Sequence, residues 1–318
     1  MKKSNIVASC LLGIGVVLML GSLVSCKGVE NLRDTKYTTK TYEITENIQN
    51  IAIQTIIADV KILPAPDGIS KVVSFEKENL KQTVTASDGT LTIGLEDTRK
   101  WYDHINLFDW RTPTVTVYLA QTEWNTLSLS GGTGDVNIAK EFFFESIDVS
   151  NRTGNVRCYA STSGLMKIKT STGNITVENV TVGVLDLTLS TGDVEVENVV
   201  CAGDVQMILS TGDTEIENLT CKNLTAKAST GELEMKNVIA QEKINIEIST
   251  GDVDFEKCDA AELYIKIGTG DVEGTLLSEK IFVVDTNTGR KRVPSTTTGG
   301  KCEIKTSTGD IEIQIVAQ

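Results

Sequence analysis

The stretch Leu185-Asp-Leu-Thr-Leu-Ser-Thr-Gly-Asp-Val-Glu-Val-Glu-Asn198 decides the fold of this chain. Apolar residues alternate with other residues on both sides of a central Thr-Gly pair, and a period of two is typical of strands that bury one face. The glycine predicts a tight turn with positive φ, a conformation that a side chain would strain. The asparagine, six residues after the glycine, marks a second corner. One unit is therefore strand, turn, strand and corner.

This unit recurs through most of the chain. Thr-Gly appears ten times at intervals of 19 or 20 residues, a regularity that chance does not produce. The residue after the glycine is acidic or an amide in every unit except the one with Arg290. The predicted turn glycines are Gly134, Gly154, Gly173, Gly192, Gly212, Gly231, Gly251, Gly270, Gly289 and Gly309.

A unit this short cannot bury its apolar face alone, but stacking successive units encloses a continuous aliphatic core. Propeller blades need about 40 residues, and sandwiches lack a fixed short period. The predicted fold class is therefore all-β: a single-chain β-solenoid (β-helix) of about ten coils of 19 or 20 residues. A less regular β cap precedes it, behind an N-terminal membrane segment. Residues 290–300 break the rhythm and are predicted to be a loop before a final coil at Cys302–Val316.

The first residues predict export. Lys2 and Lys3 precede an apolar run that ends at Ser25-Cys26, as in a signal segment. Two outcomes stay open. Leu23-Val24-Ser25-Cys26 resembles a bacterial lipobox, in which Cys26 would be lipidated after cleavage. Alternatively, residues 6–25 are long enough to remain as a single-pass anchor. Either outcome places the rest of the chain outside the cytoplasm, anchored to the bacterial cell membrane.

Four regions follow from these patterns. Residues 1–26 are the signal peptide or anchor, residues 27–45 a linker, residues 46–125 irregular β coils with the N-terminal cap, and residues 126–318 the Thr-Gly-Asp repeat solenoid. In the third region, Ala58-Asp59-Val60 is similar to a degenerate Gly-Asp-Val turn.

The Ser-Thr-Gly-Asp-Val units and the closing stretch at residues 298–311 resemble a bacterial family of β-strand-repeat proteins of unknown function. Members of that family are often labelled "putative adhesins". The resemblance runs from about Thr35 to the C-terminus. It implies an envelope-exposed, β-helix-like domain behind an N-terminal membrane segment, and it carries over no catalytic residue.

Composition excludes several function classes. The net charge of -13 argues against nucleic-acid binding, which needs lysine and arginine to neutralise phosphates. The only histidine, His104, lies in no nucleophile motif, and the seven cysteines contain no Cys-x-x-Cys pair. We therefore expect no catalytic residue, no metal site and no cofactor.

The acidic residues that follow the turn glycines would stack in a row. Such a row could recruit Ca²⁺ through its oxygen atoms, but the nonapeptide pattern of calcium-binding β-rolls is absent. The favoured interpretation is that aspartate and asparagine accept hydrogen bonds from the turn backbone.

Cys201 and Cys221 occupy the same position in neighbouring units. One rung of separation falls within the Cα range of disulfides, roughly 4.4–6.8 Å. A disulfide and a stack of small buried thiols are both open, with the stack favoured.

Aromatic residues gather just before the regular repeats. Trp101, Tyr102 and Trp110 are a candidate ligand surface, although covering the end of the solenoid would also explain them.

The sequence as a whole predicts a non-enzymatic, membrane-tethered, extracytoplasmic module of the bacterial cell envelope, with an adhesin-like binding or structural role. Its partners would be the membrane, through the N-terminus, and an unknown glycan or protein ligand. One alternative is an envelope sensor or scaffold that partners a membrane protein. A weaker alternative is a β-helical enzyme acting on polysaccharides, which short coils with few insertions argue against.

Overall fold

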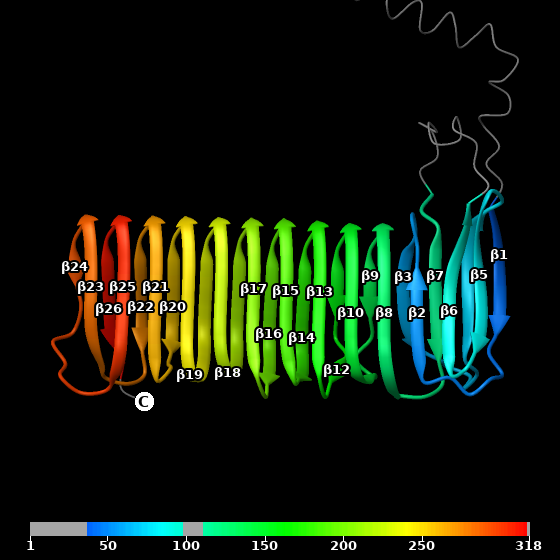
Figure 1. The fold of residues 1–318 in the computed structure, drawn as a ribbon, viewed down its shortest axis with the longest axis horizontal. Coiled ribbons are helices and arrows are strands. Elements are labelled where there is room, and N and C mark those ends of the chain that lie inside the picture. Colours follow the sequence, from blue (N-terminus) through cyan, green and yellow to red (C-terminus); the bar gives the residue numbers. More distant parts are fainter. Residues whose placement is uncertain (1–36, 98–110, 317–318) are drawn as a thin grey trace, which may run out of the picture.

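The computed structural model describes residues 37–97 and 111–316. These residues contain 26 strands and no helix, and the strands join into one sheet wound around a long axis (Figure 1). The predicted all-β solenoid of about ten turns is confirmed. No helix in the described part is long and apolar enough to cross a membrane.

Each coil contributes one strand to each of two long faces. The entry face holds the strands that lead into the Thr-Gly turn, and the exit face holds those that leave it. Strands of the entry face are β8 (Glu123–Thr133), β10 (Phe143–Thr153), β13 (Leu165–Thr172), β15 (Val184–Thr191), β17 (Asp204–Thr211), β21 (Glu262–Thr269), β25 (Gly300–Thr308) and β23 (Lys280–Thr288). Strands of the exit face are β9 (Val136–Ile138), β11 (Val156–Cys158), β14 (Ile175–Val182), β16 (Val194–Cys201), β20 (Val253–Cys258), β22 (Val272–Leu276), β26 (Ile311–Ile315) and β24 (Lys291–Arg292).

Two long strands, β18 (Thr214–Thr230) and β19 (Leu233–Thr250), continue from the exit face around the lower corner onto the entry face. A short third side closes each coil at this corner, where β12 (Ser161–Thr162) lies against β10. All these strands pair in parallel, with equivalent residues of successive coils in register. Because the register is constant, each sequence position forms a column along the rod.

The two corners use left-handed backbone. All ten predicted turn glycines have positive φ, between 125° and 152°. The second corner is turned by Asn179, Asn198, Asn218 and Asn237, with φ between 53° and 56°. Their side-chain amides also donate along the stack, as from Asn218 Nδ2 to Asn198 Oδ1 at 2.9 Å. Asparagine suits this corner because it tolerates the left-handed region better than most residues.

The core consists of aliphatic columns. Leu185, Leu187 and Leu189 point inward from the entry face, and Val194 and Val196 meet them from the exit face, all at most 1% exposed. Each such side chain contributes roughly 1.5–3 kcal/mol before conformational entropy is subtracted. Hydrophobic burial between the two faces therefore supplies most of the stability of the rod.

The coils do not stack in chain order at the C-terminal end. The predicted final coil, β25 and β26, lies between β21 and β23 on the entry face and between β22 and β24 on the exit face (Figure 1). The outermost coil is therefore the one with β23 and β24. Residues 290–300 were predicted to be a loop, but they include β24. They connect the outermost coil to β25, which lies beneath that coil.

The N-terminal end shows the same exchange. Strands β2 (Asn50–Gln54) and β3 (Asp59–Pro64) lie directly against β8 and β9, while β6 (Thr90–Asp97) and β7 (Thr114–Leu119) lie outside them. Val60 pairs with Val136, so Ala58-Asp59-Val60 does occupy the turn position of the repeat.

Antiparallel strands cover this end. Strand β4 (Lys71–Lys77) pairs with β7, and β1 (Tyr37–Glu43) pairs with β4. On the other face, β5 (Leu80–Ser87) pairs with β6. Strand β1 falls within the range predicted as a linker, so the ordered β structure begins earlier in the chain than that prediction placed it.

The turn glycines also leave no room for a side chain. A Cβ on Gly212 would lie 1.8 Å from the carbonyl oxygen of Gly192 in the coil below. We expect Gly212→Ala to destabilise the protein by about 3 kcal/mol or more, because a backbone clash adds to the strain of positive φ. The midpoint of thermal unfolding, followed by circular dichroism, measures this.

Gly68→Ala is the matched control. Gly68 also has positive φ, 71°, but nothing lies within 4 Å of the added Cβ. It should cost only about 1–2 kcal/mol, the strain of the backbone alone. Equal effects of the two substitutions would show that close stacking at the Thr-Gly turn is not what requires glycine.

Candidate functional site

Acidic residues form two adjacent columns on the exit face. They occupy the third and fifth positions after the turn glycine, and both positions point outward between buried residues. Register places neighbours in each column directly opposite one another. We call this surface the acidic face, and its residues are Glu178, Glu195, Glu197, Glu215, Glu217, Glu234, Asp254, Glu256, Glu273 and Glu312, with Lys236 the one cation between them.

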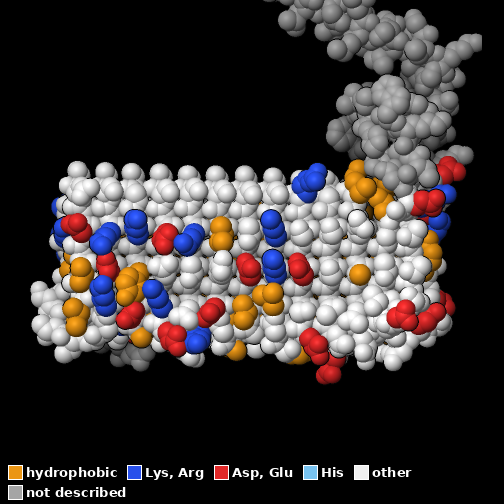
Figure 2. All heavy atoms as spheres, in the orientation of Figure 1, with side chains coloured by type: hydrophobic (Ala, Val, Ile, Leu, Met, Phe, Trp, Pro, Cys, Tyr) orange, Lys and Arg blue, Asp and Glu red, His pale blue; other side chains and the backbone are white. Residues whose placement is uncertain are grey.

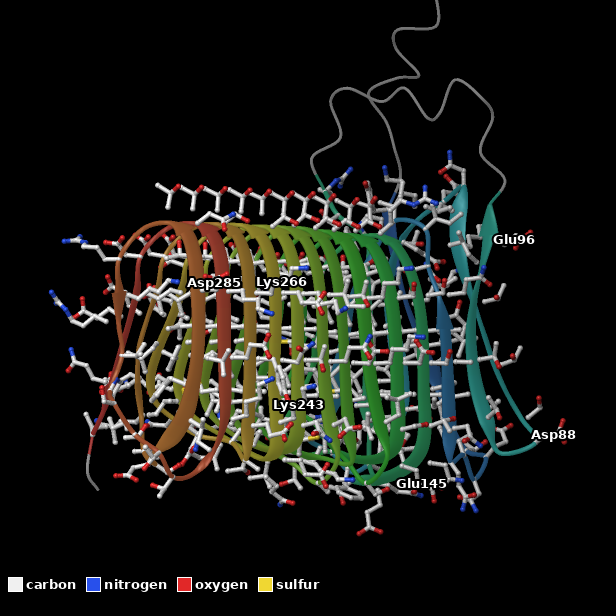
Figure 3. All side chains as sticks on the ribbon, turned by 60° about the vertical axis from the view of Figure 1, so that its left-hand side comes forward. Asp88, Glu96, Glu145, Lys243, Lys266 and Asp285 are labelled. Atoms are coloured by element: carbon white, nitrogen blue, oxygen red, sulfur yellow. The ribbon has the colours of Figure 1, made fainter. Side chains whose placement is uncertain are left out.

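The entry face is different. Its outward columns mix both signs, and Lys243 and Lys266 project from it (Figures 2 and 3). Opposite charges there pair between coils, as Lys227 Nζ and Glu247 Oε2 do at 3.1 Å. The net negative charge of the chain is thus concentrated on one side of the rod.

Two shallow hollows lie along the acidic face. One, of about 510 Å³, is lined by carboxylates of five successive coils of the stack, from Glu215 to Glu312. The other, of about 380 Å³, runs from Asn174 to Glu234. Neighbouring rungs are about 4.8 Å apart, so a ligand lying here would meet a carboxylate at every step.

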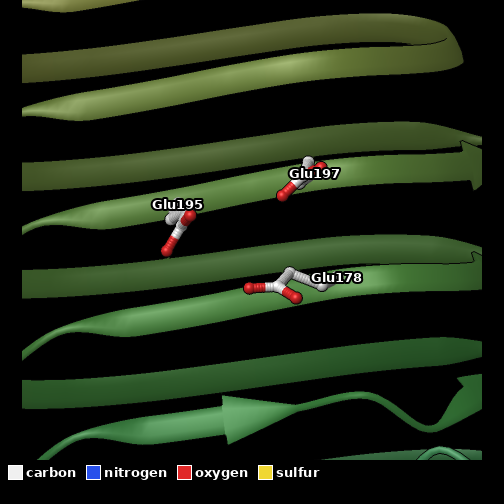
Figure 4. Close-up of side chains that lie close together, drawn as sticks. All are labelled: Glu178, Glu195 and Glu197. Atoms are coloured by element: carbon white, nitrogen blue, oxygen red, sulfur yellow. The ribbon is translucent and has the colours of Figure 1, made fainter.

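Three carboxylates lie close together at one end of this face. Carboxylate oxygens of Glu178, Glu195 and Glu197 lie within 4.8 Å of one another (Figure 4). Partial burial, and then the charges of Glu195 and Glu197, raise the pKa of Glu178. Lys236 relieves part of the repulsion further along, with Nζ 3.0 Å from Glu217 Oε1. Oxygen atoms at this spacing suit a cationic ligand group.

The acidic residues after the turn glycines do something else. In most coils the Oδ1 atom accepts a hydrogen bond from the backbone N–H of the equivalent residue one coil further on. Asp193 accepts from Asp213 N at 3.1 Å, and Asp252 accepts from Asp271 N at 2.7 Å. The row begins at Asp59, which accepts from Asp135 N. These side chains bond the backbone of the neighbouring turn rather than their own, and that explains the residue type without calcium.

Glu232 interrupts this row. Its own N–H donates to Asp213 Oδ1, but among the described contacts its carboxylate accepts nothing from Asp252 N. One additional methylene carries the oxygen past the N–H. In the sequence, Glu232 differs from the other units only in having glutamate where most have aspartate or asparagine, and the loss of the hydrogen bond was not predicted from it.

The described cysteines are structural. Cys158, Cys201, Cys221, Cys258 and Cys302 are all buried and free, so Cys201 and Cys221 form the stack of thiols and no disulfide. Burial raises the pKa of Cys221 to about 12, which suppresses the reactive thiolate.

Several predicted site residues lie outside the described part of the chain. They are the candidate ligand surface Trp101, Tyr102 and Trp110, the single histidine His104, and the lipidation candidate Cys26. The acidic face was not singled out from the sequence. A signal for it was present, because the third residue after the glycine is acidic in six units, starting with Glu195.

The fold and its repeated turn define a class of β-solenoids built from short coils. The chain belongs to the Toastrack DUF4097 family, whose family model matches residues 48–314. The resemblance to a β-strand-repeat family of unknown function is thereby confirmed.

Several solved structures are similar to this chain at low sequence identity, and the first of those described next agrees with its fold. A "putative adhesin" from Parabacteroides merdae has 14% sequence identity over 76% of this chain and 97% of its own, with a TM-score of 0.53. A "putative adhesin" from Parabacteroides distasonis has 14% identity over 88% and 98%, with a TM-score of 0.44. A "putative lipid binding protein" from the same species has 16% identity over 86% and 96%, with a TM-score of 0.42. No curated protein matched the chain.

We expect Glu232→Asp to stabilise the protein by about 0.5–1 kcal/mol, the net value of the hydrogen bond it would restore to Asp252 N. The reverse change, Asp213→Glu, should destabilise it by a similar amount, since the bond from Glu232 N would be lost. Urea unfolding of both variants measures the two effects. Changes of the same sign would mean that this row does not depend on side-chain length.

Glu178→Gln should raise stability at neutral pH by about 0.5 kcal/mol, because it removes like-charge contacts between neighbouring strands. The pKa of Glu178 is higher in the folded protein than its value of 4.5 in the unfolded chain, so its ionisation lowers the stability of the wild type as pH rises above 4.5. The variant, which cannot ionise at this position, should not show that loss of stability. Thermal unfolding across pH 3 to 8 measures it.

Glu303→Gln is a control for which we expect the opposite change in stability. Hydrogen bonds from Lys301 and Lys305 lower the pKa of Glu303 to about 2. The ionised Glu303 carboxylate stabilises the folded protein above pH 4.5, and this stabilisation is lost as pH falls toward 2. The variant should therefore be less stable than the wild type at neutral pH. Identical pH profiles for the two variants would contradict the electrostatic description of the acidic face.

Proposed function

We propose that this protein is a non-enzymatic, adhesin-like binding module, tethered outside the cytoplasm to the bacterial membrane through residues 1–26, by lipidated Cys26 or by an anchor at residues 6–25. Its contact surface would be the acidic face, and its ligand an extended, positively charged polypeptide. The observation that carries the proposal is the segregation of ten carboxylates into two in-register columns on one side of a rigid rod.

The geometry supports a polymer rather than a small molecule. The two hollows are shallow and follow each other along the rod, so they continue one surface across several coils. Lysine and arginine side chains of an extended segment could meet carboxylates on successive rungs. Electrostatic complementarity of this kind governs specificity and association rate more than affinity.

The relatives support the adhesin-like role. A solved structure of similar fold, from Parabacteroides merdae, is named a "putative adhesin", and the likeness covers three quarters of this chain. At 14% identity that likeness concerns the fold, so the choice of ligand rests on the acidic face alone.

The test compares two double variants with equal change of net charge. Glu215→Lys with Glu234→Lys reverses two neighbouring positions of the acidic face. Asp148→Lys with Asp186→Lys reverses two charges of the entry face, on either side of Lys167 in one column. Binding of the purified chain to poly-L-lysine and to a panel of basic extracellular-matrix proteins would be measured by biolayer interferometry at low and high salt. We expect at least a tenfold loss for the first variant and less than twofold for the second.

Other outcomes would redirect the proposal. Equal losses in both variants would indicate a response to net charge alone and would refute a specific acidic face. Binding to a neutral glycan, unchanged by either variant, would place the ligand elsewhere. Absence of any surface ligand would favour the sensor or scaffold alternative, which crosslinking in intact membranes would then address.

A further inference from the structure

The outermost coil at the C-terminal end leaves one long strand edge without a partner. Within the described part of the chain, β23 pairs with β25 on one side and with no strand on the other (Figure 1). The edge is closed only at its start, where the Thr296 hydroxyl donates to the Lys280 carbonyl. From Ile281 onward the N–H and C=O groups of alternate residues bond to β25, and those of the residues between them face away from β25 toward no other strand of the described chain. Such an edge is a template for pairing with another chain.

This edge is also apolar. Ile281 and Val283 are 47% and 46% exposed on the outer surface. Phe282 and Val284 point toward the core but stay only partly buried, whereas Cys302, next to Phe282 in the column, is fully buried. The hydrophobic interior of the rod is therefore open at this end, while the opposite end is covered by antiparallel strands.

The charged side chains of β23 are in ion pairs. Lys280 is 3% exposed and its Nζ lies 2.5 Å from Asp259 Oδ1. Asp285 Oδ1 lies 2.9 Å from Lys291 Nζ. On the exit face, Arg290 and Arg292 pair with Asp310 and Glu312 of the coil beneath. Natural edges are often protected by charged side chains. Here the two charged residues of β23 itself, Lys280 and Asp285, are each held in an ion pair.

We propose that β23 of a second copy of this chain occupies the edge, in antiparallel register about a twofold axis at Val283. Residues directly opposite in an antiparallel pair lie on the same face of the sheet. In this register Phe282 meets Val284 of the partner copy, so the two open cores join. Ile281 meets Asp285 on the outer surface. The contact is the same patch on both copies, so it closes at two chains.

The dimer would join two rods tip to tip. The described N-terminal strands lie at the far end of each rod, and each rod of ten Thr-Gly coils with two further coils is roughly 55–60 Å long at about 4.8 Å per rung. If the N-terminus is tethered, a point that rests on the proposed function, the pair would connect two facing membranes. The partner of the adhesin-like module at its tip would then be another copy of itself.

Disulfide trapping of the full chain in detergent tests the register. Val283→Cys places the new thiol opposite itself, at a Cα separation of about 4.5–5.5 Å that disulfides accept. Ile208→Cys is the matched control, since Ile208 is also exposed, at 38%, but lies on β17, which has partners on both sides. The wild-type chain, with Cys10 and Cys26, sets the background.

We expect mild oxidation to give a covalent dimer from Val283→Cys at least fivefold above both controls, with the 283–283 crosslink found by mass spectrometry. A yield equal to that of Ile208→Cys would overturn the proposal, as would a ladder of larger species or crosslinking to a different protein in intact cells.

A second measurement removes dependence on the cysteine. Vesicles of phosphatidylcholine carrying the full chain should cluster, and Val283→Lys should abolish clustering while Ile208→Lys does not. Both positions are exposed, so unchanged melting temperatures would show that the variants fold. If poly-L-lysine binding persists while Val283→Cys fails to crosslink, the tip contact is refuted and the proposed function stands. Crosslinking without any ligand binding would leave the tip contact standing and remove the acidic-face ligand.

Discussion

The close approach of successive coils at the Thr-Gly turn is the constraint on which the rest of the structure depends. The N–H of every turn glycine except Gly289, which lies in the outermost coil, donates to the threonine carbonyl of the adjacent coil, as from Gly192 to Thr211 at 3.1 Å. The space into which a Cβ on each turn glycine would project is filled by the preceding coil of the stack, so a side chain has no place there. Aspartate or asparagine then bonds the neighbouring turn. Together these contacts permit one register, because a slip of one residue would put a side chain at the glycine position and turn the apolar columns outward.

A fixed register converts each repeat position into a line of identical neighbours, and the surface chemistry follows. Columns of carboxylates at about 4.8 Å intervals repel one another, and each such contact costs about 0.2–1 kcal/mol. A single buried aliphatic side chain contributes roughly 1.5–3 kcal/mol, so the core readily offsets a whole column. The entry face shows that the fold does not require this arrangement, since its columns contain both cations and carboxylates. The acidic face is therefore a property that this sequence adds to the fold, and for that reason it is the surface to which we assign binding.

Most of the fold could be predicted from local pattern. The glycine spacing, the alternation in Leu185–Leu189 and the corner asparagines all describe a single unit, and a solenoid is a repetition of one unit. The candidate site was readable in principle from the third and fifth positions after each glycine. The order of the terminal coils could not be predicted, because the coils are so alike that either β23 or β25 could pair with β21. Tertiary contacts such as Lys280 with Asp259 distinguish the two orders, and no local pattern encodes them.

The exchanged order at both ends has a physical consequence. In a solenoid stacked in chain order, the last coil is both the chain terminus and the outermost layer, so it can peel away after breaking contacts on one side only. Here β26 is held between β22 and β24, and β2 is held between β6 and β8, so removal of either chain-terminal coil must break two interfaces. The layer left outermost at the C-terminal end is instead held by chain connections on both sides. This arrangement lets an open edge such as β23 persist without fraying. A strand that stays formed while its edge is unpaired is preorganised for a partner, since little conformational entropy remains to be lost on binding.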